Sequence, residues 1–326
     1  MNVHRLTVWA VSCALALGAA APAMASEQAW PAKPIKLIIP FPPGGPTDSL
    51  GRQFAEKLRA SLGESVIVEN VGGANGSIGM SRVASAAPDG YTLGLGAVGT
   101  QVINPLLYPN PPYDTFKDFS PISLVSEYVN VLVVNQELPV KSVADLIDYA
   151  KKNPGKVTYG SAGQGSSNHL SAALFASSAG IEATHVPYRG SAPALVDLMA
   201  GNTTFMFDVM VNSMPQVRAG KLRALAVSGA KPDPQVPELP PVAQTLPGYE
   251  VLGWFALYGP PGMPKDIVTK LSQATAAISQ DAELTASMAK QGFNIAASTP
   301  EQLTERMAKD IETLGPVIKA SGAKVE

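Results

Sequence analysis

The sequence predicts an α/β fold of two lobes, each a mixed, mostly parallel sheet flanked by helices, with a hinge between them. Short apolar stretches alternate with amphipathic helical patterns from about residue 35 onward, which is typical of parallel strands covered by helices. The alternation restarts near residue 130, and the helical patterns after residue 265 are expected to pack back on the first unit. A chain that leaves a lobe and returns to it crosses between the lobes at least twice, and such crossings form a hinge.

The first unit shows a regular alternation of strand and helix patterns. Its clearest helix covers residues 49–62, because Leu50, Phe54, Leu58 and Leu62 recur at a spacing of four and share one face. The predicted strands are 35–41, 66–69 and 91–97, and the predicted helices are 49–62 and 76–86.

The second unit repeats this organisation in the middle of the chain. Ser142 is placed to cap a helix at 143–152, with Asp145 at the third position of a capping box. Gly180 ends a predicted helix at 167–179, because glycine readily adopts the left-handed conformation after a last helical turn. The other predicted elements are strands at 130–134, 157–160, 184–188, 203–208 and 222–227 and a helix at 191–200.

A proline-rich segment follows the second unit. Residues 231–248 carry prolines too densely for a regular element, so we expect an extended wrap over the surface. A strand at 251–258 and helices at 265–279 and 300–314 come next. The predicted lobes therefore cover residues 26–124 together with 229–326, and residues 125–228.

The first 25 residues are predicted to be a secretory signal peptide. A short basic head ending at Arg5 precedes an apolar run, and Ala23-Met24-Ala25 provides a small-x-small cleavage site. The run is too short for a stable membrane anchor, so we expect a periplasmic protein. Cys13, the single cysteine, lies within this segment, which leaves the exported chain without thiol chemistry.

Composition argues against several functional classes. The 24 basic and 26 acidic residues nearly balance, so nothing indicates a nucleic-acid partner. His169 and His185, the histidines of the exported chain, show no metal-ligand spacing, and we expect neither metal nor cofactor. No later stretch is apolar enough to span a membrane.

The stretch IIPFPPGGPTDSLGRQF, residues 38–54, predicts a site for an anion. The first N–H groups of a helix lack partners inside the helix and carry partial positive charge. Gly44 and Gly45 leave room for a ligand oxygen to approach the backbone, and Thr47 or Asp48 is placed to cap the helix. Phe41 either covers the aliphatic part of a ligand or belongs to the core. Taken alone, the stretch fits an ordinary strand-to-helix turn better than an anion site.

The stretch VTYGSAGQGSSNHL, residues 157–170, repeats strand, Gly/Ser loop and helix start in the second unit. Two such loops, one per lobe, can grip a small anion with backbone donors from both sides of a cleft. The small donors of this loop include Ser161, Gly163, Ser166 and Ser167. An alternative is an exported serine hydrolase that uses Ser166 or Ser167 with His169.

A third strand-loop-helix segment, residues 185–201, places two more candidates at the cleft edge. Arg189 offers a planar fork of donors to a carboxylate, or else forms a surface or hinge salt bridge. Tyr188 lies beside it. Asp208 follows a strand near the cleft, and we expect it to receive an ammonium or hydroxyl at the far end of a ligand.

Six motifs taken in order resemble the extracytoplasmic binding proteins of tripartite tricarboxylate transporters, the Bug or TctC-type family. The match runs from about residue 34 to 262 and fits the C-terminal helices. The motifs are PFPPGGPTD, NVGGANGSIG, APDGYTL, YGSAGQGSSNHL, VPYRGSAPAL and GKLRALAVSG. The segment SGAKPD, residues 228–233, departs from the family by lacking a basic residue after its strand.

The resemblance implies a flytrap-like periplasmic-binding-protein fold that closes on a small carboxylated solute. It implies that the loop Phe41–Asp48, including Pro43, and the loop Ser161–His169, including Ala162, pinch one carboxylate. Thr100, Tyr188, Arg189 and Asp208 would line the rest of the pocket. It further implies a non-enzymatic monomer that delivers a di- or tricarboxylate, amino acid or aromatic acid to membrane permease subunits. A periplasmic sensor partner binding the same solutes is the alternative.

Overall fold

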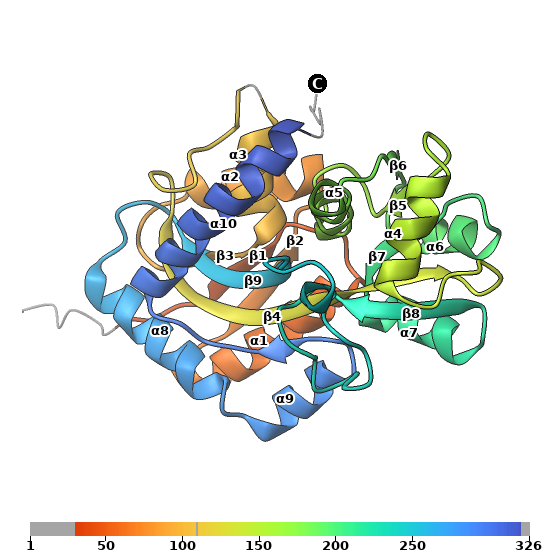
Figure 1. Cartoon of the computed structure of the whole chain (residues 1–326). Coiled ribbons are helices and arrows are strands. Elements are labelled where there is room, and N and C mark those ends of the chain that lie inside the picture. The colour runs from red at the N-terminus through yellow and green to blue at the C-terminus, as the bar shows by residue number, and fades with distance from the viewer. Residues whose placement is uncertain (1–29, 109, 321–326) are drawn as a thin grey trace, which may run out of the picture.

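The computed structural model describes residues 30–108 and 110–320, and its elements fall into two lobes (Figure 1). The predicted signal peptide, residues 1–25, lies outside the described residues. Both ends of the described chain belong to the first lobe. Its elements are strands β1 (Ile35–Ile39), β2 (Val66–Asn70), β3 (Thr92–Ala97), β9 (Leu252–Gly259) and β10 (Asn294–Ile295), helices α1 (Pro46–Leu62), α2 (Ser77–Ala84), α3 (Asn104–Leu107), α8 (Lys265–Ile278), α9 (Ala282–Ala289) and α10 (Pro300–Ala320), and short helices η1 (Ala74–Gly76) and η2 (Gly99–Ile103).

The second lobe comes from the middle of the chain and lies at the right of Figure 1. The strand β4 (Ser120–Asn135) enters it from the first lobe and belongs to both. The other elements of this lobe are strands β5 (Thr158–Ser161), β6 (Thr184–Pro187), β7 (Phe205–Val209) and β8 (Leu222–Val227), and helices α4 (Val143–Lys152), α5 (Ser167–Ala179), α6 (Ser191–Met199) and α7 (Met210–Arg218).

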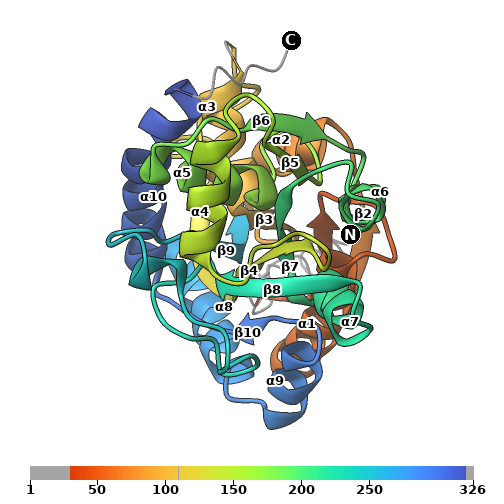
Figure 2. The same ribbon diagram turned by 45° about the vertical axis from the view of Figure 1, so that its right-hand side comes forward.

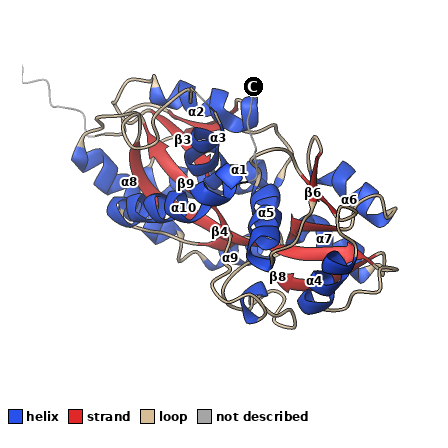
Figure 3. Cartoon of the chain, turned by 45° about the horizontal axis from the view of Figure 1, so that its top comes forward, coloured by secondary structure: helices blue, strands red, loops and turns tan. Residues whose placement is uncertain are grey.

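The described strands form one sheet of ten that bends at β4 (Figure 3). In the first lobe β1, β2, β3 and the start of β4 run in one direction, and β9 and β10 run against them. In the second lobe β5, β6, β7 and β8 run together and only the end of β4 opposes them. Each half is therefore mixed, as the sequence predicts, and most of its strands run in one direction. Because β4 and β9 lie between strands of opposite direction, five of the nine pairings between the described strands are nevertheless antiparallel.

The apolar cores follow the same division. Helices α1, α8 and α9 cover one face of the first sheet, and α2 and α10 cover the other. The wrap predicted at 231–248 contains one short helix, η3 (Val242–Gln244), and buries Val236, Leu239 and Val242 against second-lobe cores. Helix α5 lies beside α10 (Figure 2). Leu170 on α5 packs into a first-lobe cluster. The division at residues 125 and 228 stays a prediction.

Two local predictions differ from the structure. Helix α1 begins at Pro46, with Gly45 as its N-cap and no side-chain cap, so the prediction that Thr47 or Asp48 caps it is wrong. Proline is favoured at the first helical position, where its missing N–H costs nothing. The predicted strand 130–134 is the last part of the much longer β4.

Candidate functional site

A cavity of about 720 Å³ is lined by residues of both lobes, and we take it as the candidate site. First-lobe residues come from the β1–α1 loop, the η1 region, the end of β3, the strands β4 and β9, and the segment just before β10. Second-lobe residues come from the starts of α5, α6 and α7. The lining residues are Phe41, Pro42, Pro43, Gly44, Gly45, Thr47, Asn75, Ala97, Val98, Gly99, Tyr128, Ala162, Gly165, Ser166, Ser167, Asn168, Arg189, Gly190, Ser191, Ala192, Pro193, Val209, Asn212, Phe255 and Phe293.

The β1–α1 loop is held by a buried carboxylate behind it. Asp48 lies in the first turn of α1, and its Oδ2 accepts hydrogen bonds from Gly44 N and Arg52 Nε, both at 2.9 Å. Its Oδ1 accepts from Asn70 Nδ2 at 2.9 Å. The Arg52 hydrogen bond, aided by Gly44 and Asn70, lowers the pKa of Asp48 to about 2. Asp48 is therefore ionised and fixes the loop without lining the cavity.

The β5–α5 loop is held by neutral groups. Ser166 caps α5, because its Oγ accepts from His169 N at 3.2 Å while donating to Gly163 O at 2.7 Å. His169 Nδ1 accepts a hydrogen bond from Gly165 N at 3.2 Å. Ser166 and His169 thus fix the backbone of the loop. The loop residues that line the cavity are Ala162, Gly165, Ser166 and Ser167.

Two stacked histidines support this second loop. The rings of His169 and His185 lie 4.0 Å apart and nearly parallel, and His185 Nε2 lies 2.7 Å from Ser161 Oγ. Burial lowers the pKa of His169 to about 3, with a further contribution from His185, and burial lowers that of His185 to about 4. Both rings are therefore neutral near pH 7.

A buried aspartate ties together two more helix starts. Asp208 Oδ1 accepts from Ser191 Oγ at 2.6 Å and from Asn168 Nδ2 at 2.9 Å. Val209 N–H and the Asn212 amide are close enough to lower its pKa, yet neither completes a hydrogen bond to Oδ2. Burial outweighs these contacts and raises the pKa of Asp208 to about 7. Asp208 thus positions cavity-lining Ser191 and Asn168 from behind.

Four helices begin at the cavity wall. The starts of α1, α5, α6 and α7 all contribute lining residues, one from the first lobe and three from the second. Each helix start carries a partial positive charge of about half an elementary charge and N–H groups without intrahelical partners. Among the described residues that line the cavity, Arg189 alone carries a charged side chain. The cavity therefore favours an anion.

The predicted site residues divide into two groups. Nine line the cavity, namely Phe41, Pro43, Gly44, Gly45, Thr47, Ala162, Ser166, Ser167 and Arg189. Seven do not, namely Asp48, Thr100, Ser161, Gly163, His169, Tyr188 and Asp208. These seven lie outside the cavity lining, and their contact with a ligand stays a prediction.

The hydrogen bonds of three of these residues show how they support the cavity wall. Thr100 Oγ1 is fully buried and bonds both Ala97 N and Ala97 O, so it closes a turn beneath the cavity. Tyr188 Oη donates to Asp197 Oδ2 at 2.6 Å on α6. Asp208 is fully buried, and its Oδ1 accepts from Ser191 and Asn168, so the expected contact with a ligand ammonium or hydroxyl stays a prediction.

Sequence reasoning missed part of the wall. Tyr128, Phe255 and Phe293 carry no local signal, because strand pairing and packing bring them together. Asn75 lies in the motif NVGGANGSIG, and its Nδ2 reaches Gly165 O across the lobes at 3.5 Å. Asn168 also lines the cavity. It lies in the stretch 157–170, directly after Ser167, so its place in that loop could have predicted a cavity position.

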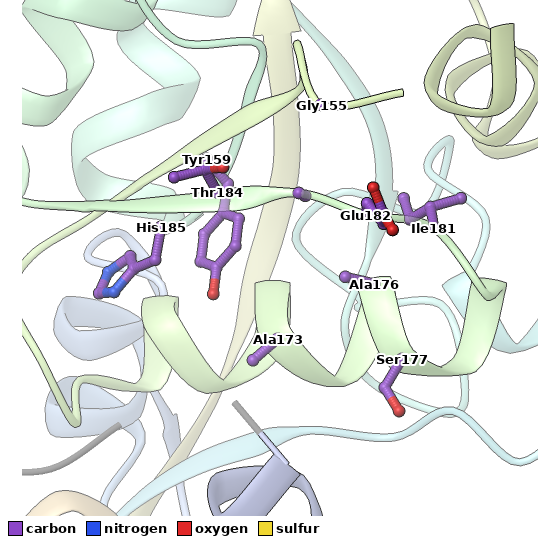
Figure 4. A pocket seen from close by; sticks show the side chains of 10 residues that line it. Gly155, Tyr159, Ala173, Ala176, Ser177, Ile181, Glu182, Thr184 and His185 are labelled. Carbon is purple, nitrogen blue, oxygen red and sulfur yellow. The ribbon is translucent and has the colours of Figure 1, made fainter. Parts of the chain in front are cut away.

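A second hollow, of about 490 Å³, lies on the second lobe alone (Figure 4). It is bounded by α5, the start of β5 and the start of β6, with Tyr159 and His185 at one side. No helix start faces it, and it is lined from one lobe, so we do not assign the anion site there.

The hydrolase alternative does not fit the geometry. Ser166 Oγ bonds to backbone groups, and the His169 ring accepts from Gly165 N and stacks on His185. Neither Ser166 nor Ser167 has a hydrogen bond to the His169 ring among the described contacts. General-base activation of a serine needs such a contact or a close approach to it.

Within residues 30–108 and 110–320, no helix is both long and apolar enough to cross a membrane. The same residues contain no group of three or more His, Cys, Asp or Glu side chains that could hold a metal ion.

Comparisons with known proteins agree with this picture. A family model described as the tripartite tricarboxylate transporter family receptor, TctC, matches residues 50–323. BugT of Bordetella pertussis is 35% identical over 328 residues and covers 100% of both chains. A Pseudomonas protein named for the tcbD-tcbE intergenic region is 36% identical over 95% of this chain and 93% of its own.

Solved structures show the same relationship. A Rhodopseudomonas palustris protein solved with adipate has 38% identity and a TM-score of 0.81, covering 91% of this chain and 100% of that chain. The periplasmic binding protein BugD has 34% identity and a TM-score of 0.77, with the same coverage. Proteins of this family are periplasmic solute-binding proteins. The chain therefore belongs to the TctC family of tripartite tricarboxylate transporter receptors and is a solute-binding protein, not an enzyme.

Proposed function

We propose that the chain captures a small organic carboxylate between its lobes and delivers it to the permease subunits of a tripartite tricarboxylate transporter. The convergence of four helix starts from both lobes on one cavity carries the proposal. Solved relatives at 38% and 31% identity were obtained with adipate and with malate, both dicarboxylates. The location that we propose is the periplasm, reached through the N-terminal signal peptide.

Binding shifts the lobes toward closure in this proposal. A carboxylate that meets donors from both lobes binds the closed form better than the open form, so it increases the closed population. Asn75 Nδ2 of the η1 region lies 3.5 Å from Gly165 O of the β5–α5 loop, so the two lobes already touch at the cavity edge. The permease then recognises the closed, loaded protein.

The function is tested by titrating the purified protein with adipate, malate and succinate in a calorimeter. We expect saturable binding by the wild type. A Gly45→Leu variant should lose affinity at least about 100-fold, because the side chain would enter the cavity beside the α1 start. Gly45 has φ −84°, which any residue adopts, and a Cβ there meets no atom within 4 Å, so the variant should fold.

Gly315→Leu is the matched control. Gly315 lies on α10, away from the cavity, and a Cβ there also meets nothing within 4 Å. Its affinity should equal that of the wild type. Unchanged titrations of Gly45→Leu would contradict the proposed site, and the absence of binding by any carboxylate would contradict the function.

A further inference from the structure

One wall of the cavity is aromatic. Tyr128 and Phe255 stack with ring centroids 5.5 Å apart, and Phe293 meets both edge-on, at 5.5 Å and 5.8 Å. All three line the cavity while belonging to the first-lobe core. The three rings pack against one another and are largely buried, so their positions are fixed by the core.

The chain makes room for this wall at a specific glycine. Tyr128 on β4 pairs with Gly253 on β9, and a Cβ on Gly253 would lie 2.0 Å from Tyr128 Cζ. The ring therefore lies flat across the neighbouring strand, where any larger residue would displace it. The Tyr128 hydroxyl lies 3.3 Å from Ser167 Oγ at the start of α5, which joins the aromatic wall to the donor side of the cavity.

No acidic side chain of the described residues lines the cavity. Both oxygens of Asp48 accept hydrogen bonds from Gly44, Arg52 and Asn70. Asp208 is fully buried behind Ser191 and Asn168. The exposed Arg189 forms no ion pair with a described residue, which leaves its charge for a ligand. A ligand ammonium would therefore meet helix starts and a guanidinium instead of a carboxylate, which is unfavourable.

Building on the proposed function, we infer that the cavity selects carboxylates with an uncharged, apolar body and rejects α-amino acids of the same skeleton. The helix starts hold the carboxylate, and the rings of Tyr128, Phe255 and Phe293 receive the body. A volume of about 720 Å³ exceeds what a four-carbon acid fills, so the class includes arylalkanoates and longer dicarboxylates.

Matched ligand pairs test the inference by calorimetry. We compare 3-phenylpropionate with L-phenylalanine, and adipate with L-2-aminoadipate, because each pair differs by one ammonium group. We expect the amino acid to bind about 100-fold more weakly in each pair, since its charge gains no partner. Equal affinity within a pair would overturn the inference while leaving the proposed function intact. Failure of every carboxylate, amino or not, would instead overturn the proposed function.

Two variants test the aromatic wall. Phe293→Leu removes the ring at similar apolarity and should weaken 3-phenylpropionate about tenfold while leaving succinate within about twofold. Phe119→Leu makes the same change in the first-lobe core away from the cavity, and should alter neither affinity. An equal loss of both ligands in Phe293→Leu would show general damage and overturn the role of the wall.

Discussion

The two loops that line the cavity from opposite lobes have similar sequences, but different side chains fix their backbones. The first loop depends on an ionised carboxylate, Asp48, that bonds Gly44, Arg52 and Asn70. The second depends on neutral groups, the Ser166 cap and the stacked rings of His169 and His185. Equivalent donor geometry therefore does not require equivalent support, and the two loops should respond differently to substitution and to pH.

The largest expected effect is on the first loop. Asp48→Ala leaves the Gly44 N–H and the Asn70 amide without their acceptor, so the free energy of unfolding should fall by about 2 to 3 kcal/mol. Carboxylate affinity should fall more than tenfold, because the loop that lines the cavity loses its anchor. Chemical denaturation and calorimetry measure the two effects. An unchanged affinity would show that the first loop holds its shape without Asp48.

The second loop should weaken on acidification. The pKa values of His169 and His185 lie below the ordinary value of 6.5, at about 3 and 4, so the stability they contribute is present above pH 6.5 and is lost as pH falls toward those values. Asp48, with its pKa near 2, loses its contribution only below its ordinary value of 3.8. Acidification from pH 7 to 4.5 therefore acts on the second loop first.

The variant His169→Phe isolates this effect, since it keeps a ring in the stack and removes the titrating group. Between pH 7 and 4.5 its free energy of unfolding should fall by roughly 2 kcal/mol less than that of the wild type. Asp208 titrates in both proteins and opposes the histidines, because its raised pKa makes the folded state less stable as pH rises from 3.8 to about 7. Parallel pH profiles for the two proteins would contradict the role of His169.

The smallest effect compares two serine caps. Ser166→Ala and Ser142→Ala each remove an N-cap acceptor, from His169 N and Asp145 N, and each should cost about 1 kcal/mol of stability. Only Ser166 lies at the cavity, so only its variant should weaken carboxylate binding, by a few-fold. Equal affinities for both variants would show that the cap of α5 does not shape the site.

Local signals predicted the parts of the fold that are locally determined. Helix α4 has the predicted bounds because Ser142 caps it and Asp145 completes the first turn. Helix α7 was missed because its N-cap Val209 offers no side-chain acceptor and Pro215 lies inside the helix, against ordinary propensity.

The site divides in the same way. The Gly-rich loops can be predicted from the sequence, because small residues before a helix start let an anion approach the backbone N–H groups. The wall of Tyr128, Phe255 and Phe293 does not, because those residues meet through pairing of β4 with β9 and packing of the following chain. Asp208 was placed near the cavity by sequence, but only three-dimensional packing shows that Ser191 and Asn168 cover it.

The strand β4 has a consequence for exchanging parts between relatives. Its first half pairs with β9 and its second half with β7 and β8, so one continuous segment completes two sheets. A chimaera joined at residue 125 would combine halves of this segment from two ancestries. Such a junction would have to preserve the pairing of β4 with β9 and also its pairing with β7 and β8. A transplant that carries residues 120–135 intact takes the whole strand from one parent. Lobe recombination in this family is therefore constrained by a single shared backbone segment.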